Sequence, residues 1–224
     1  MKAVLISVQP QWCELIARGK KTIEVRKTRP KIETPFKCYI YMMSKGNKPI
    51  KEIEMPNGSA YVEVDYKMTG KVIGEFVCNR IDKFESEFWD DDTYEQIKCF
   101  YKSDDPEDEP KYCYDVVGES GDFYSNFALG EKSCLTWDKL RKYIGQGINI
   151  FYGWHISDLK IYDKPKELGE FRKPDEPFHE NSINENGHLV FCDGYKEGGV
   201  LTRPPQSWGY VEELERRTMK KRKQ

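Results

Sequence analysis

The sequence predicts a mixed α+β protein in which several curved β-strands form a barrel with flanking helices. Short stretches that alternate apolar and polar residues recur along the chain, and this pattern is typical of strands with one buried face. Glycines inside the stretch 70–82 predict bends or bulges in a long strand. Aromatic residues make up 13% of a chain whose hydrophobic content is only 38%, so we expect a compact, aromatic-rich core.

The first elements are expected to be a strand, a helix and a second strand. Residues 2–8 are β-prone. Pro10 suits the first turn of a helix that continues over residues 11–18, and Gly19 is a typical residue just past a helix end. Residues 22–26 alternate again and predict the second strand.

The same signals place the later elements. Strands are expected over residues 36–43, 59–66, 70–82, 148–162 and 187–192, and helical turns around 93–101, 136–145 and 165–168. Residues 171–186 are polar and Pro-rich and predict a surface excursion, residues 203–209 form a distinctive loop, and residues 210–224 are helix-like. We expect a single domain over residues 1–212, with an acidic insertion at about 82–130 and a basic tail at 213–224.

The charge balance excludes a protein whose whole surface attracts polyanions. Lys and Arg number 36 against 38 Asp and Glu, which gives a net charge of −2. A site for nucleic acid must therefore be local.

The sequence also favours a cytoplasmic protein with no membrane partner. The apolar run among the opening residues is too short, and its surroundings are too polar, for a signal peptide. No apolar stretch is long enough to cross a bilayer. The seven cysteines are odd in number and never spaced as C-x-x-C, which favours reduced thiols over disulfides or a zinc site. We predict no metal and no cofactor.

Residues 19–26 carry the most specific motif, G-x-K-x-x-E-x-R. Side chains alternate along a strand, so Glu24 and Arg26 are expected on one face. Lys21, at the end of the preceding loop, is expected to approach Glu24. Three charged groups then converge near the end of the first helix.

On this motif the chain resembles the ASCH family of the PUA-like superfamily, bacterial and phage members above all. Residues 6–12 match that family's opening of a strand, a polar residue, Pro and a helix, and residues 70–76 and 154–168 resemble its barrel strands. The resemblance implies a PUA-like mixed β-barrel and a cleft beside the motif. Its expected ligands are RNA, single-stranded nucleic acid or a modified nucleotide.

The motif has two interpretations. Lys21 and Arg26 would hold a phosphate or the acceptor edge of a base while Glu24 accepts from an exocyclic amine. Alternatively, the three residues form an ordinary salt-bridged strand edge, which is the commoner case for charged neighbours on a strand. The family resemblance favours the ligand site, with Ser7 or Gln9 at its edge.

Further candidate ligand-binding residues lie in polar or glycine-bounded segments. Trp154 and Trp208 can present a flat ring to a base, although burial is equally consistent with their sequence context. Of the three histidines, His155 is the one that lies inside a strong strand pattern. Prolines stiffen residues 203–208 and can orient polar groups toward the cleft. The candidates beyond the motif are Ser7, Gln9, Trp154, His155, Arg203, Gln206, Ser207 and Trp208.

Nucleic-acid or nucleotide binding is therefore the leading hypothesis, with two alternatives. Some ASCH-type proteins are amidohydrolases that act on an acylated cytidine through a Lys and a Thr of this motif. Lys21 matches the Lys, but Glu24 stands at the Thr position, so a hydrolase would have to use Lys21 and Glu24. The second alternative is an interaction protein of phage or prophage type, whose acidic stretch at 82–115 binds a basic partner.

Overall fold

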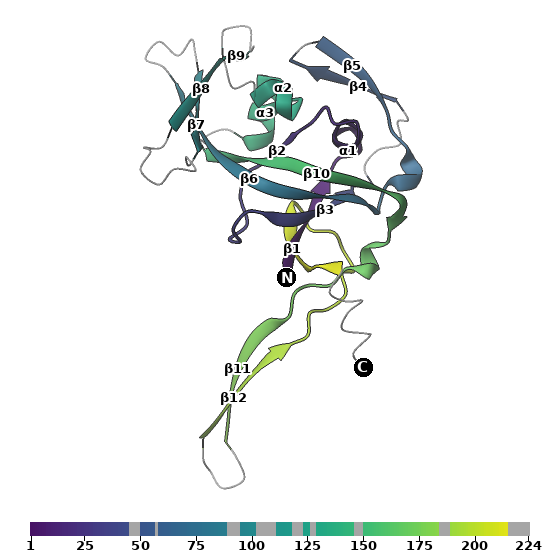
Figure 1. Cartoon of the computed structure of the whole chain (residues 1–224), viewed down its shortest axis with the longest axis vertical. Helices are drawn as coiled ribbons and strands as arrows, with labels where there is room; N and C mark the ends of the chain where they lie inside the picture. The colour runs from purple at the N-terminus through teal and green to yellow at the C-terminus, as the bar shows by residue number, and fades with distance from the viewer. Residues whose placement is uncertain are drawn as a thin grey trace.

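The computed structural model describes residues 1–44, 50–56, 58–88, 95–101, 111–117, 123–125, 129–145, 150–183 and 189–214. Its elements are, in chain order, β1 (Lys2–Val8), α1 (Pro10–Ala17), β2 (Ile23–Arg26), β3 (Phe36–Met42), β4 (Ile50–Met55), β5 (Gly58–Glu63), η1 (Tyr66–Met68), β6 (Val72–Phe88), β7 (Glu95–Tyr101), β8 (Lys111–Val117), β9 (Phe123–Ser125), α2 (Leu129–Ser133), α3 (Trp137–Ile144), β10 (Ile150–Lys166), η2 (Leu168–Glu170), β11 (Glu176–Ile183), β12 (Leu189–Lys196) and β13 (Trp208–Glu212). The protein is mostly β-sheet with a few short helices (Figure 1).

One large sheet organises the molecule. Six of its strands follow the order β2-β10-β6-β3-β1-β13, in which only the β1–β3 pair is parallel. The far half of β6 continues into the antiparallel strands β7, β8 and β9. Register shifts between β6 and β10 interrupt this ladder at three points, as expected for two long and strongly bent strands.

The predicted barrel is not confirmed as a closed structure. Among the described residues, β2 pairs only with β10, and β13 pairs only with β1, so these two strands are the edges of the six-stranded path. The sheet is therefore open in its backbone hydrogen bonding. Side chains, described below, connect the two edges.

Both faces of the central strands are buried, which explains their high apolar content. On one face, residues of β1, β3 and β6 pack with α1 and Trp154. On the other face, Leu5, Tyr39 and Val211 pack with Phe171, which precedes the β11–β12 hairpin. The Tyr39 and Phe171 ring centroids are 5.0 Å apart in an edge-to-face arrangement.

Helix α1 begins and ends as its sequence predicts. Pro10 lies in its first turn, and Cys13, Leu15 and Ile16 are buried in two hydrophobic clusters. Gly19 follows with a φ of 69°, a left-handed conformation that favours glycine. This turn directs the chain back into β2.

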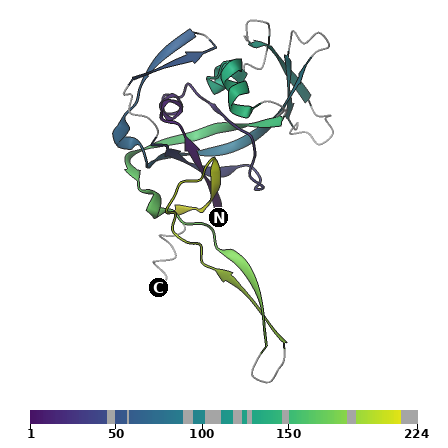
Figure 2. The ribbon, with the colours of Figure 1, turned by 180° about the vertical axis from the view of Figure 1, so that it is seen from behind.

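Helices α2 and α3 cover one face of β2. Ile23 and Val25 pack there with Phe84, Leu140 and other residues of a separate cluster. In Figure 1 these helices lie between the β7–β9 strands and the β4–β5 hairpin, and Figure 2 shows the same arrangement from behind. Ile53 and Val62 of that hairpin pack against Leu15 of α1.

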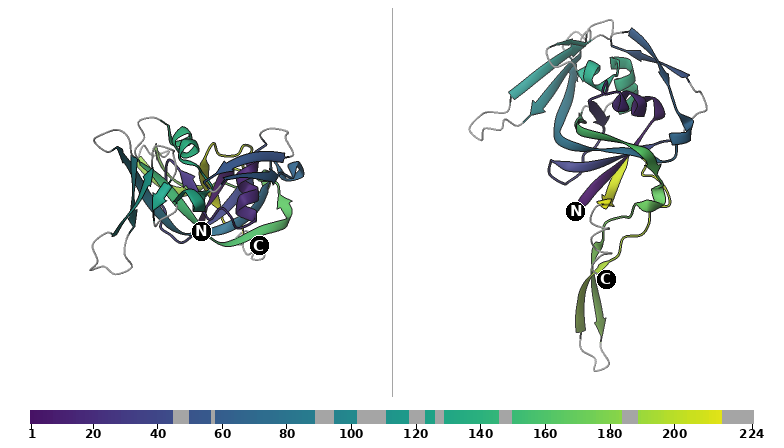
Figure 3. Two further views of the ribbon diagram at one scale, coloured as in Figure 1. Left: turned by 90° about the horizontal axis from the view of Figure 1, so that it is seen from above. Right: turned by 45° about the vertical axis from the view of Figure 1, so that its right-hand side comes forward.

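The β11–β12 hairpin projects away from the rest of the molecule (Figures 1 and 3). Its eight register pairs run from Glu176–Lys196 to Ile183–Leu189. The base of this arm is fixed by a bridge between Arg172 and Val200.

Several predicted elements are confirmed and others are wrong. The strands at 2–8 and 36–43 and the helices at 11–18 and 136–145 are confirmed within one or two residues. Residues 95–101 form β7 rather than a helix, and residues 93 and 94 lie outside the described residues. The main-chain hydrogen bonds offered by β6 outweigh the local helical preference there.

Three further predictions need correction. Residues 165 and 166 still belong to β10, and the helical turn begins at Leu168. The expected excursion at 171–186 contains β11, which pairs with β12. Residues 210–212 belong to β13, because the edge of β1 provides a partner for them, and residues 215–224 of the expected helix lie outside the described residues.

Two findings concern the predictions about membrane segments and cysteines. Within the described residues, no helix combines the length and the apolar character needed to cross a membrane. Cys13, Cys38, Cys78 and Cys134 are buried free thiols. Burial raises the pKa of the Cys78 thiol to about 12, and it raises the pKa of Cys13 and of Cys38 well above the ordinary value.

Candidate functional site

The motif residues Lys21, Glu24 and Arg26 form a buried ionic network, called here the motif network. Their exposed fractions are 2%, 7% and 5%. Glu24 lies between the two cations: its Oε2 is 3.3 Å from Lys21 Nζ, and its Oε1 is 3.0 Å from a terminal nitrogen of Arg26. Buried charges at such depth require pairing, and each of these has it.

The end of α1 positions Lys21. The backbone N–H groups of Lys20 and Lys21 both donate to the carbonyl of Leu15, which turns the chain sharply after Gly19. The Lys21 ammonium then donates to the carbonyl of Ser133 at 2.7 Å and lies 5.6 Å from the centre of the Trp12 ring. Lys21 thus has a carboxylate, a carbonyl and an aromatic face around it.

Arg26 connects the two edges of the open sheet. From β2 it donates to the carbonyl of Ser7 at 2.9 Å and to both the carbonyl and the hydroxyl of Ser207 at 3.2 Å. Ser7 is the penultimate residue of β1, and Ser207 directly precedes β13. The Ser7 hydroxyl donates to the carbonyl of Pro205 at 2.6 Å, which fixes the 203–208 loop to the same place.

Three buried polar atoms near this network have no hydrogen-bond partner among the described residues. They are Glu24 Oε2, Arg26 Nε and Trp154 Nε1. Trp154 is fully buried and lies directly opposite Glu24 in the β10–β2 ladder, so the two residues share a face of the sheet. Glu24 Oε2 keeps its ion-pair contact with Lys21. An unsatisfied buried polar group costs about 1–3 kcal/mol, so the donors Arg26 Nε and Trp154 Nε1 call for partners that the described residues do not supply.

Tyr143 of α3 is a component of the site that the sequence analysis missed. Its hydroxyl hydrogen-bonds with the side chains of Arg26 and Ser207. Burial raises the pKa of Tyr143, and the positive charge of Arg26, with the hydrogen bonds to Arg26 and Ser207, partly offsets that increase. The residue is 40% exposed, so it lies between the buried network and solvent. No local signal marked it, because it meets Arg26 only through the packing of α3 on β2.

Trp208 completes the surroundings on the β13 side. Its ring centroid is 5.9 Å from that of Trp154, and its indole N–H donates to the Thr28 hydroxyl at 3.0 Å. This contact is a second side-chain link between the chain after β2 and β13. Trp154 and Trp208 therefore lie in contact beside the motif network, one buried and one half-buried.

Other candidate residues lie apart from the network. Gln9 is exposed, and its side chain accepts from Gln11 at 2.7 Å, while its carbonyl caps the first turn of α1. Gln206 is exposed. Arg203 is exposed and lines a different cavity, described below.

His155 belongs to a separate group on β6 and β10, called here the rim cluster (Arg80, Asp82 and His155). His155 pairs in register with Ile23 rather than with Glu24. Its Nε2 is 2.6 Å from Oδ2 of the fully buried Asp82, and Arg80 Nε is 2.9 Å from Oδ1 of the same carboxylate. The histidine thus serves a local ion-paired cluster and not the motif network.

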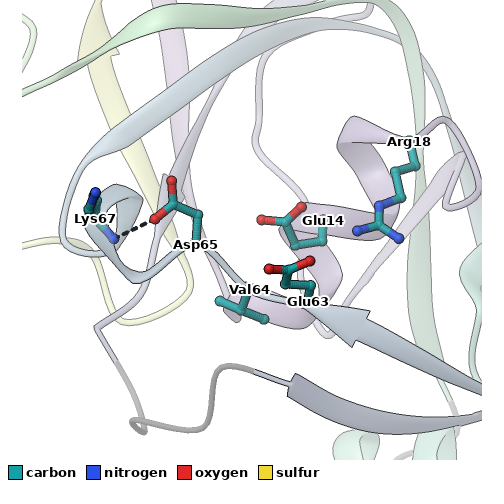
Figure 4. A pocket seen from close by; sticks show the side chains of 6 residues that line it. All are labelled: Glu14, Arg18, Glu63, Val64, Asp65 and Lys67. Atoms are coloured by element: carbon teal, nitrogen blue, oxygen red, sulfur yellow. Dashed lines mark hydrogen bonds between the residues drawn. The ribbon is translucent and has the colours of Figure 1, made fainter.

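A cavity of about 520 Å³ lies beside α1 (Figure 4). Glu14, Glu63 and Asp65 give it an acidic lining, with Arg18 and Lys67 at its sides. Burial raises the pKa of Glu14, and the backbone N–H of Asp65 opposes that increase. None of the predicted site residues lines it, and no group of three or more potential metal ligands occurs in the part of the chain that the structure describes.

Comparison with known proteins agrees with the motif. The ASCH domain matches residues 6–119, which is about half of the chain. The chain belongs to the ASCH domain family. The family is PUA-like in fold and generally binds RNA. Among curated proteins, no sequence matches the chain.

Solved ASCH structures are similar at a distance. The crystal structure of ASCH from Zymomonas mobilis is 16% identical, with a TM-score of 0.47, and the match covers 98% of this chain and 94% of that one. A tyrosine-to-phenylalanine variant of the same protein is 15% identical, with a TM-score of 0.47, over 99% and 98% of the two chains. At this distance the likeness assigns no residue roles.

Proposed function

We propose that this ASCH protein binds a nucleotide of RNA or single-stranded nucleic acid at the motif network. The observation that carries the proposal is a pair of buried donors without hydrogen-bond partners among the described residues, Arg26 Nε and Trp154 Nε1, beside Glu24 Oε2, which contacts Lys21 Nζ but makes no hydrogen bond. One acceptor and two donors are complementary to a base edge that carries an amine beside acceptor atoms. A base bound there would satisfy polar groups that have no hydrogen-bond partner among the described residues.

The surroundings of the network support a short ligand segment. The whole chain has a net charge of −2, so long-range attraction of a polyanion is weak. Two cations held within the network and exposed Lys27, 5.7 Å from the Tyr143 ring, provide local positive charge. Tyr143 occupies the solvent side, so an entering base has to displace its hydroxyl from Arg26 or accept a hydrogen bond from it.

The contacts favour binding over hydrolysis. The Lys21 ammonium is engaged by Glu24 and by the Ser133 carbonyl, and Glu24 is engaged by both cations. A lysine held in this way is a donor rather than a base, and position 24 offers no hydroxyl nucleophile.

The proposal extends to the architecture around the site. We infer that residues 1–212 form one domain in the cytoplasm, and that β2-β10-β6-β3-β1-β13 act as a PUA-like barrel closed by side chains. The contacts of Arg26 with Ser7 and Ser207 support this reading. The β7–β9 strands would then be the acidic insertion, added to the far half of β6.

Equilibrium binding of RNA and single-stranded DNA tetranucleotides tests the proposal. Arg26→Lys keeps the charge but removes the fork of donors, so the affinity should fall about tenfold. Truncation after Leu214, which removes the basic tail, should lower the affinity less than about threefold, because dispersed charges are screened. Arg80→Lys in the rim cluster is the matched control. Equal losses for truncation and for Arg26→Lys would indicate nonspecific electrostatic binding and would contradict the proposal.

A further inference from the structure

A second cavity, called here the loop pocket, lies between the base of the β11–β12 arm and the β1–β13 pair. Its volume is about 280 Å³. Its apolar residues include Leu5, Leu201 and Val211, which belong to the cluster on the sheet face opposite Trp154. Pro174 and Pro205 also line it. Such a cavity is slightly smaller than the usual range for drug-sized ligands and suits a ligand of a single base or nucleotide.

The charged residues that line the loop pocket favour an anion. Lys173 and Arg203 contribute two cations against the single carboxylate of Glu176. Neither cation forms an ion pair with another described residue. Free cations beside an apolar surface are complementary to a ligand with a flat apolar body and an attached phosphate.

One loop separates the loop pocket from the motif network. Pro205 and Gly209 line the pocket, while Ser207, between them, accepts hydrogen bonds from Arg26. Pro205 is itself bound to Ser7 through its carbonyl. The loop before β13 is therefore shared by the two sites.

We propose that the loop pocket binds the nucleotide adjacent to the one held at the motif network. This inference rests on the proposed function. The base would pack on the apolar residues, and Lys173 and Arg203 would contact the connecting phosphate. Affinity should consequently rise from a mononucleotide to a dinucleotide, and the increase should depend on the two cations.

The test compares binding of a mononucleotide and a dinucleotide to the full chain by calorimetry. The double variant Lys173→Gln/Arg203→Gln removes two charges from the pocket. The control Lys160→Gln/Lys164→Gln removes two charges from exposed positions of β10. In the pocket variant the dinucleotide affinity should fall about tenfold and the mononucleotide affinity less than twofold, whereas the control should change neither beyond twofold.

The outcomes separate the two proposals. A dinucleotide whose binding depends on Arg26 but not on Lys173 and Arg203 would overturn the loop pocket and leave the motif site intact. Binding that depends on the pocket cations and not on Arg26 would overturn the motif site, and with it the role of the loop pocket as the adjacent position, while leaving the pocket as an independent nucleotide site. Failure of both ligands to bind the parent chain would contradict the proposed function, and the loop pocket with it.

Discussion

Glu24 and Asp82 are both buried carboxylates with two nitrogen-bearing partners, yet their surroundings differ. Lys21 and Arg26 are themselves buried and are fixed to the carbonyls of Ser133, Ser7 and Ser207. In the rim cluster, the Arg80 side chain is 50% exposed and pairs with Asp82 two residues along the same strand.

The two clusters make different contributions to the fold. The rim cluster joins neighbours on β6 and β10 that already share a backbone ladder. The motif network instead links β2 to β1 and to the loop before β13, which no ladder joins. Each carboxylate has one oxygen without a hydrogen bond, but only the motif network also has a buried donor, Arg26 Nε, without a partner among the described residues. Similar charges therefore produce a local strand contact in one place and, in the other, a structural junction with an unsatisfied buried donor.

The largest expected effect is on stability. Arg26→Ala leaves Glu24 buried with one cation and separates the two sheet edges, so we expect the free energy of unfolding to fall by about 3–5 kcal/mol. Arg80→Ala removes a half-exposed partner while His155 stays beside Asp82, and should cost about 0–1 kcal/mol. Urea denaturation followed by tryptophan fluorescence measures both. Losses of similar size would show that the two clusters are equivalent.

Alkaline pH should weaken the protein through thiols that lie beside the two clusters. Burial raises the pKa of Cys78 from 9.0 to about 12. The pKa of Cys13 is also raised, by burial and by the charge of Glu24. Because the unfolded chain releases these protons first, stability is retained below about pH 9 and decreases as the pH rises toward 12. The slope approaches about 1.4 kcal/mol per pH unit for each such group.

The unfolding free energy measured from pH 8 to 11 checks this prediction. Cys78→Ala lacks one of the shifted thiols, so its stability should decline less steeply than that of the parent chain. A profile that is flat over this interval, or that rises, would contradict the assigned direction.

A smaller effect is expected for Tyr143. Tyr143→Phe removes the hydroxyl that hydrogen-bonds with Arg26 and Ser207, at a cost of about 1 kcal/mol in stability. Since an entering nucleotide no longer competes with that hydroxyl, tetranucleotide affinity should increase about fivefold. Tyr162→Phe is the matched control: it loses a hydrogen bond from β10 to Glu75 of β6 and should leave affinity unchanged. Weaker binding by Tyr143→Phe would mean that the hydroxyl contacts the ligand directly.

Local signals in the sequence were sufficient for the first part of the fold. Pro10 and Gly19 mark the ends of α1, and the alternation after Gly19 predicts β2. Local signals were insufficient where contacts with distant segments of the chain decide the structure. The charged strand β4 is stabilised by packing on α1, and β7 forms because β6 offers a free edge.

The site shows the same division. The approach of Lys21, Glu24 and Arg26 follows from spacing, because six consecutive residues of one turn and one strand contain all three. The contacts with Ser133, Tyr143 and Ser207 connect residues more than 100 positions apart and depend on how α2, α3 and β13 pack. Prolines predicted a stiff loop at 203–208, of which Trp208 belongs to β13, but spacing could not reveal that Arg203 lines a cavity.

The central claim is that Glu24, and not merely a buried carboxylate, receives the ligand. Glu24→Gln and Asp82→Asn make the same near-isosteric change in the motif network and in the rim cluster. Calorimetric titration of each variant with an RNA tetranucleotide should give an affinity loss of at least about tenfold for Glu24→Gln and less than about twofold for Asp82→Asn. Equal losses, or a larger loss for Asp82→Asn, would contradict the account.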